Sequence, residues 1–92
     1  MREVTWTSKA SADLVRLYEF LASADKPAAI RTVWTLTAAP AGLPAHPRIG
    51  ERLEEFDPRE VRRILVGHYE IRYEIQKSTI TVLRLWHTRE SR

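Results

Sequence analysis

The stretch Val61–Arg89, with the sequence VRRILVGHYEIRYEIQKSTITVLRLWHTR, alternates apolar and polar side chains over most of its length. A period of two is typical of β-strands. The clearest run is Tyr69–Gln76. One face of this run carries Tyr69, Ile71, Tyr73 and Ile75, and the other carries Glu70, Arg72, Glu74 and Gln76. The pattern predicts a strand in a sheet that has one packed face and one face in water.

Two short connections divide this stretch into three strands. Gly67-His68 separates Tyr69–Gln76 from an earlier apolar run, Ile64–Val66, and Lys77-Ser78 separates it from a later one, Thr79–Trp86. Connections of two residues favour hairpins between neighbouring antiparallel strands. We therefore expect a three-stranded antiparallel meander.

The N-terminal half predicts one strand followed by two helices. Glu3–Trp6 alternates and suits an edge strand, and Thr7 and Ser8 then offer N-cap oxygens for a helix over Lys9–Ala22. Pro27 suits the first turn of a second helix, which must end by about Ala39 or Ala41. The apolar positions that repeat at spacings of three and four are Ala10, Leu14, Leu17, Tyr18 and Leu21, then Ile30, Val33, Trp34 and Thr37.

Together these elements predict an α+β fold with the order β-α-α-β-β-β in a single domain, 1–92. Pro40 to Gly50 is rich in proline and glycine, so we expect it to be loop, and Asp57-Pro58 marks a turn before the meander. No apolar run approaches the roughly 20 residues that span a bilayer. We expect a cytoplasmic protein without a membrane partner.

The amino-acid composition limits the kinds of binding site and reaction that the protein can support. The chain has no cysteine, and its three histidines show no paired spacing, so we expect no metal and no cofactor. The formal net charge is +3, and arginine is concentrated in the last third of the chain. Guanidinium groups suit phosphate or carboxylate partners, although Arg–Glu pairs across a solvated sheet face explain the same residues. These arginines are Arg59, Arg62, Arg63, Arg72, Arg84, Arg89 and Arg92.

No catalytic dyad, phosphate loop or nucleophile elbow is present in the sequence. Cleavage of RNA remains conceivable, because the 2′-hydroxyl of the substrate attacks and the protein needs only an acid, a base and a cation. A purely structural reading makes His87 a side chain at a sheet end and Trp86 a core residue. The available groups are Arg72, Arg84, Arg89, His68, His87, Glu70 and Glu74.

The order of these segments resembles the ParE/RelE superfamily of toxins from bacterial type II toxin-antitoxin, or plasmid stabilisation, systems. The resemblance covers almost the whole chain. Its most specific parts are Pro47–Gly50 in the loop, the strand Tyr69–Ile75, and the ending Leu83–Glu90, which contains Trp-His-Thr-Arg-Glu. The last two look more like the ParE branch than the RelE branch.

The branch decides the expected activity, because RelE-like members cleave mRNA on the ribosome whereas ParE-like members inhibit DNA gyrase and cause growth arrest. RelE-like nucleases carry an arginine directly after the tyrosine of the central strand, but here Glu70 follows Tyr69, and no tyrosine occurs from Trp86 onward. Arg89 and His87 do match positions of the nucleases. The resemblance therefore implies a non-catalytic gyrase inhibitor. The nuclease alternative relies on Arg72, Arg84, His87 and Arg89.

The resemblance also implies a cognate ParD-like antitoxin, which alone would contact operator DNA. An acidic amphipathic segment of it would suit both the apolar helices and the arginines. A third reading is an inactive relic that serves only as a ligand for the antitoxin. We predict antitoxin contacts at Leu14, Leu17, Tyr18, Trp34, Arg62, Arg72, Arg84 and Arg89, and target contacts at Trp86, His87, Arg89 and Arg92.

Overall fold

The computed structural model describes residues 1–90 of the chain and confirms the predicted α+β fold. The elements are β1 (Glu3–Trp6), α1 (Ser8–Ala22), α2 (Lys26–Ala38), the 3₁₀ turn η1 (Ala39–Gly42), β2 (Glu51–Arg52), the 3₁₀ turn η2 (Glu54–Phe56), β3 (Glu60–Val66), β4 (Tyr69–Ile75) and β5 (Thr79–His87).

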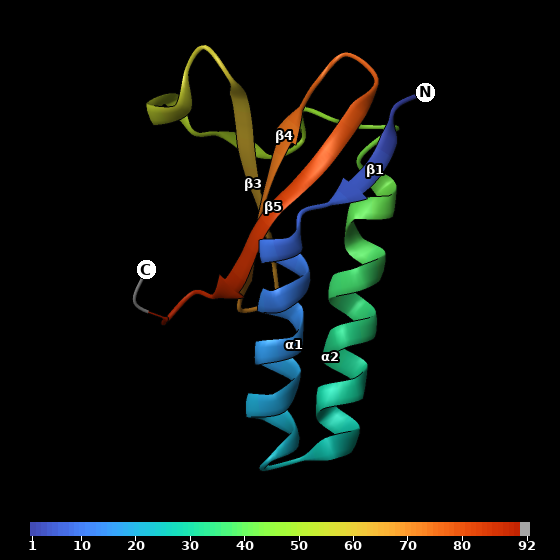
Figure 1. Cartoon of the computed structure of the whole chain (residues 1–92), viewed down its shortest axis with the longest axis vertical. Helices are drawn as coiled ribbons and strands as arrows, with labels where there is room; N and C mark the ends of the chain where they lie inside the picture. The colour runs from blue at the N-terminus through green and yellow to red at the C-terminus, as the bar shows by residue number, and fades with distance from the viewer. Residues whose placement is uncertain (91–92) are drawn as a thin grey trace.

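The strands form one sheet in the order β1-β5-β4-β3-β2. The three C-terminal strands make the predicted antiparallel meander, and β1 adds to its edge parallel to β5. In Figure 1 the two helices lie side by side as a hairpin, with α1 next to β5 and the turn between the helices far from the sheet. Part of each helix therefore extends beyond the sheet.

Local capping explains where the helices begin. The side chain of Thr7 accepts a hydrogen bond from the backbone N–H of Ala10 at 3.0 Å, so α1 begins at Ser8. The side chain of Asp25 accepts one from the N–H of Ala28 at 3.1 Å, and Pro27 lies in the first turn of α2. Both devices satisfy N–H groups that the helix itself leaves without partners.

The core lies between the helices and one face of the sheet. On that face Tyr73 is fully buried, and Ile71 and Ile75 are also buried, as the alternation predicts. One core cluster joins both helices to β4 and β5, and a second lies under η1 and the following loop. Their buried residues are Ala10, Leu17, Leu36, Ile71, Val82 and Leu85 in the first, and Leu43, Tyr73, Ile75 and Ile80 in the second.

The opposite face of the sheet is not uniformly in water, contrary to the expectation. Glu70 is only 1% exposed, and Trp86 is also buried. Arg63 and Arg72 bind the Glu70 carboxylate, and the Arg72 guanidinium lies 4.8 Å from the centre of the Trp86 ring. Alternation assigns a residue to a face, but neighbouring long side chains decide whether water reaches it.

The loop expected between α2 and the meander contains a strand that the sequence analysis missed. β2 has only two residues, and Glu51 pairs with Arg63 of β3. Two residues are too few to show any periodicity. Just before it, Gly50 packs so closely that a Cβ atom would lie 2.6 Å from the backbone oxygen of Arg63. Among residues 1–90, no helix is long and apolar enough to cross a membrane.

Candidate partner-binding pocket

A pocket of about 460 Å³ lies between α1 and the ends of β4 and β5. Leu17, Phe20 and Leu21 line it from the helix, and Tyr69 lines it from the sheet. The remaining lining residues, Arg16, His87, Arg89 and Glu90, are polar or charged. Its walls are therefore largely apolar, with charged groups among the lining residues.

Helix α1 packs against β5 beside the pocket because β5 is longer than β1, the strand next to it at the edge of the sheet. β1 pairs with β5 only as far as Val82, so the edge of β5 beyond that point has no strand beside it. Side chains of α1 and its cap take the place of the missing strand. Thr7 donates its hydroxyl to the carbonyl of Leu83 at 2.9 Å, and Asp13 accepts from the N–H of Leu85 at 3.0 Å. These two backbone groups of the edge are thus satisfied by α1 and its N-cap residue.

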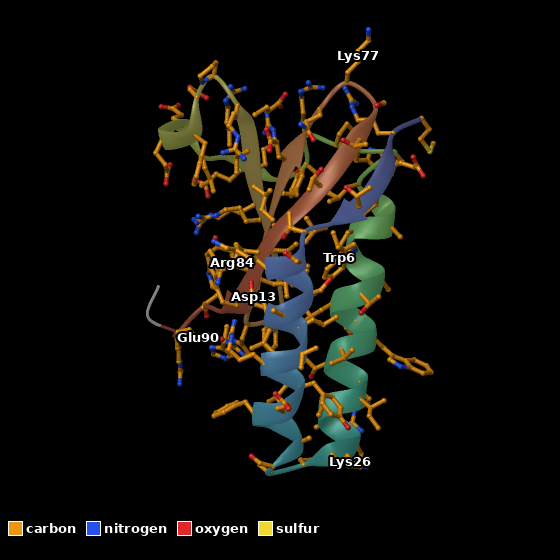
Figure 2. The ribbon with its side chains drawn as sticks, in the orientation of Figure 1. Trp6, Asp13, Lys26, Lys77, Arg84 and Glu90 are labelled. Atoms are coloured by element: carbon orange, nitrogen blue, oxygen red, sulfur yellow. The ribbon has the colours of Figure 1, made fainter. Side chains whose placement is uncertain are left out.

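Asp13 is the centre of this contact and is only 4% exposed. Its carboxylate binds Arg84 through hydrogen bonds of 2.7 and 3.1 Å, and Arg16 at 3.2 Å. Burial by itself raises the pKa of Asp13, but the hydrogen bonds from Arg84, the Leu85 N–H and Arg16 together outweigh it and leave the pKa below its ordinary value. Figure 2 shows Asp13 and Arg84 beside each other where α1 meets β5.

His87, the last residue of β5, and the next three residues form a turn through Glu90 that closes one side of the pocket; we call it the C-terminal turn. The Glu90 carboxylate accepts a hydrogen bond from the N–H of His87 at 2.9 Å and binds Arg16 at 2.5 Å. Burial raises the pKa of Glu90, but these two hydrogen bonds outweigh it and lower the pKa overall. Because Arg16 belongs to α1, the turn is tied to that helix through a charged hydrogen bond.

Aromatic rings fill the space between the turn and β4. His87 meets Tyr69 edge to face with the ring centres 5.2 Å apart, and it stacks with His68 at 5.9 Å. The Nδ1 atom of His87 accepts a hydrogen bond from the backbone N–H of Arg89 at 3.1 Å. An accepting Nδ1 places the proton of the neutral imidazole on Nε2. Burial raises the pKa of Tyr69, so its hydroxyl is protonated at neutral pH.

Most of the predicted partner-binding arginines already have partners inside the chain. Arg62 binds Glu60 at 2.9 Å, Arg72 binds Glu70 at 3.2 Å, and Arg84 binds Asp13. Arg59, which lies just before β3, binds Glu74 of β4. Arg63 of β3 binds Glu51 of β2 and Glu70 of β4, so the interpretation of Arg–Glu pairs across strands is confirmed for Arg63. Within residues 1–90, Arg89 makes no side-chain ion pair. It is the one member of the predicted arginine set whose charge is not balanced within that part of the chain.

The predicted apolar contacts are spread over several surfaces. Leu17 lines the pocket while lying mainly in the core at 3% exposed, Leu14 packs against the core, and Tyr18 is half-buried. Trp34 is exposed on α2 and does not line the pocket. Phe20 was missed because it falls off the apolar stripe of α1. The sequence signal that could have identified Phe20 is that it is a large aromatic residue outside this stripe.

The predicted target contacts are also divided. His87 and Arg89 line the pocket, whereas Trp86 is buried on the opposite face of the sheet under Arg72 and Arg84. Arg92 lies outside the described residues. The four residues of the nuclease alternative are split in the same way, two in the pocket and two in internal ion pairs. All these partner and target roles stay predictions. The described residues contain no group of three or more side chains that could hold a metal ion.

Comparisons with known proteins agree with this fold. A family model described as the ParE toxin of type II toxin-antitoxin system, parDE, matches residues 4–92. The chain therefore belongs to the ParE toxin family. A solved structure described as a chromosomal ParDE TA system from P. aeruginosa superposes with a TM-score of 0.79 at 22% identity. The superposition covers 95% of this chain and 96% of that one, and it shows a shared fold. No curated protein sequence matches the chain.

Proposed function

We propose that this toxin inhibits DNA gyrase by direct protein–protein contact in the cytoplasm and is neutralised by a cognate antitoxin of the ParD kind. Membership of the ParE family supports a toxin with such an antitoxin. The observation that favours a binding mechanism over RNA cleavage is the state of Arg72 and Arg84. Both guanidinium groups are bound to buried carboxylates of the same chain, Glu70 and Asp13.

A cation that stabilises a phosphate in a transition state must be free to contact it. Releasing Arg72 would leave Glu70, which is 1% exposed, with one fewer of its arginine partners, and uncompensated buried charge is costly. The guanidinium of Arg72 also lies over the rings of Phe56 and Trp86. These contacts favour a structural role for Arg72 over contact with a nucleic acid.

The direct test is gyrase-dependent supercoiling of relaxed plasmid with the purified chain, run beside mRNA cleavage on stalled ribosomes. We expect supercoiling to be inhibited and the mRNA to stay intact. Arg89→Ala should weaken the inhibition, whereas Arg31→Ala, which also removes a cation without an ion pair among residues 1–90, should not. Unchanged supercoiling would refute the gyrase proposal. If expression without antitoxin also failed to arrest growth, the chain would be an inactive relic.

One observation favours the nuclease as a second candidate. His87 and Arg89 line the same pocket as Tyr69, so a possible acid or base lies near a cation that has no ion-pair partner among residues 1–90. Cleavage by this group would require His87, because its imidazole ring offers both a nitrogen that can accept a proton and one that can donate it. Cleavage of ribosome-bound mRNA that is abolished by His87→Ala would establish the nuclease and replace the gyrase proposal.

A further inference from the structure

We propose that a second pocket, between α2 and the turn that joins β3 to β4, binds a terminal phosphate group. This pocket has a volume of about 300 Å³ and is lined by residues of both elements; we call it the α2 pocket. Among the lining residues it shares only Tyr69 with the pocket beside the C-terminal turn. The proposal goes beyond gyrase inhibition and does not depend on it.

The α2 pocket has a cation in its lining and no carboxylate among the lining residues that the structure describes. The cation is Arg31, whose guanidinium makes no ion pair and no hydrogen bond among residues 1–90. The only other charged residue of α2 is Lys26, which is also basic. Asp25, the acid nearest to these residues in the sequence, caps the helix at the N–H of Ala28 and does not line the pocket. The guanidinium is therefore available to an anion from outside the chain.

Both walls of the α2 pocket also carry hydrogen-bond donors. His68 lies in the turn, and its imidazole has one N–H when neutral and two when charged. Thr32 adds a hydroxyl from α2 that interacts with the hydroxyl of Tyr69, so we count one donor for the pair. Thr35 is not counted, because it donates its hydroxyl to the backbone carbonyl of Arg31 at 2.9 Å. A guanidinium, an imidazole and a hydroxyl thus line one cavity from two sides.

This set of donors suits a phosphate better than a carboxylate. A phosphate monoester has three strong acceptor oxygens and a charge of about −1.5 to −2 at neutral pH. A carboxylate has two oxygens and a single charge. The volume of about 300 Å³ lies at the lower end of the range for ligand pockets. A terminal phosphate enters such a space from one side, whereas a backbone phosphate needs room for the chain on two sides. The site therefore fits the phosphate of a nucleotide or of a nucleic-acid 5′ end.

The two walls of the α2 pocket are held in place before a ligand arrives. The N–H of Thr88 donates to the carbonyl of His68 at 2.8 Å, and the ring of His68 stacks with that of His87 with the centres 5.9 Å apart. These contacts fix the turn from the side of the C-terminal turn. The opposite wall belongs to a helix that is anchored in the core through Leu36, which is fully buried. Walls that are already ordered lower the cost of binding.

The first experiment titrates the full-length chain with inorganic phosphate at constant ionic strength and follows the backbone amide shifts by NMR. We expect the largest shifts at Gly67, His68 and Arg31. Arg31→Gln should weaken binding roughly tenfold or more, because a charged hydrogen bond is lost. Lys26→Gln is the matched control, since it removes the other cation of α2, which does not line the pocket. This control should stay within about twofold of the wild type.

A second pair of variants tests the hydroxyl at the same site. Thr32→Val should weaken phosphate binding roughly three- to tenfold, because one neutral hydrogen bond is lost. Thr37→Val is its control, since Thr37 also lies on α2 but outside the pocket. Equal losses in Arg31→Gln and Lys26→Gln would show a general attraction to the positive chain and would overturn the site. An absence of shifts at millimolar phosphate would overturn it as well.

A second experiment distinguishes the sources of the phosphate. Adenosine monophosphate is compared with adenosine, and a short DNA strand with a 5′-phosphate is compared with the same strand ending in a 5′-hydroxyl. In each pair we expect only the phosphorylated ligand to shift the amides of the α2 pocket, and the tighter of the two identifies the source. Equal binding of the two DNA strands would show contact with the backbone and would overturn the assignment to a terminal phosphate.

Discussion

The carboxylate of Asp13 accepts a hydrogen bond of 3.0 Å from the backbone N–H of Leu85 and thereby joins α1 to the part of the β5 edge that has no neighbouring strand. The same carboxylate binds Arg84 and Arg16. A single buried acid thus satisfies one N–H at a strand edge, binds two arginines and positions the helix that forms one wall of the pocket. The stability of the fold and the shape of the candidate site depend on the same group.

Replacing Asp13 with Asn should lower the free energy of unfolding by about 1–3 kcal/mol, because charged hydrogen bonds to a buried partner are lost. The estimate stays below that for a fully buried pair, since the Arg84 side chain is 42% exposed. Urea unfolding at neutral pH measures the change. Glu51→Gln, which removes an exposed pair with Arg63, is the control and should cost less than about 0.5 kcal/mol. Equal losses would contradict the central role of Asp13.

Stability should fall in acid for the same reason. The pKa values of Asp13 and Glu90 are lowered in the folded state, so the folded protein holds these protons less tightly than the unfolded chain does. Their contribution is therefore complete at neutral pH, above the ordinary carboxyl pKa values, and is lost as pH falls through the lower folded values. Urea midpoints measured from pH 7 down to about pH 3 should decline in the acid range. In Asp13→Asn this decline should be shallower.

Gly50 should tolerate no side chain. A Cβ atom there would lie 2.6 Å from both the Arg63 carbonyl oxygen and the Tyr73 hydroxyl. Gly50→Ala should therefore destabilise the fold by about 1–3 kcal/mol, as overpacking usually does. Gly42→Ala is the matched control, because a Cβ at Gly42 meets nothing within 4 Å. Thermal unfolding of the two variants should separate them clearly. Equal melting temperatures would show that the loop moves aside.

The hydroxyl of Tyr73 should fasten the same loop to the sheet. It donates to the carbonyl of Pro47 at 2.7 Å and accepts from the N–H of Gly50 at 3.1 Å. Tyr73→Phe leaves the buried Gly50 N–H and the part-buried Pro47 carbonyl without their partner and should cost about 1–3 kcal/mol. Tyr18→Phe is the control, since the Tyr18 hydroxyl makes no hydrogen bond with residues 1–90. Chemical denaturation of both variants provides the comparison, and a neutral Tyr73→Phe would refute the assignment.

Charge reversal should separate structural arginines from free ones. Arg72→Glu places a carboxylate next to Glu70, which is buried, and should destabilise the fold by about 3 kcal/mol or more. Arg89→Glu breaks no ion pair within residues 1–90, so its unfolding free energy should change by less than about 0.5 kcal/mol. Unfolding curves recorded before any binding assay will show whether weaker antitoxin binding by either variant reflects the interface. A stable Arg72→Glu variant would contradict the structural role of its pairing.

The sequence by itself determined most of the fold, because both helices and the four longer strands carry their own local signals. Alternation over Tyr69–Ile75 and the two-residue connections fixed the meander, and the cap at Thr7 and the proline at position 27 fixed the helix starts to within one residue. The two-residue strand β2 left no such signal. Its place was decided by pairing with β3 and by the close packing of Gly50.

The candidate site was decided only by the tertiary structure. The sequence showed that Arg72, Arg84 and Arg89 are cations, but not that carboxylates on other elements bind the first two and leave the third without an ion pair among residues 1–90. Phe20 and His87 come together in one pocket although they lie far apart in the chain. Periodicity reports the face on which a residue lies within its own element. Which side chains meet across elements depends on how α1 packs against the edge of β5.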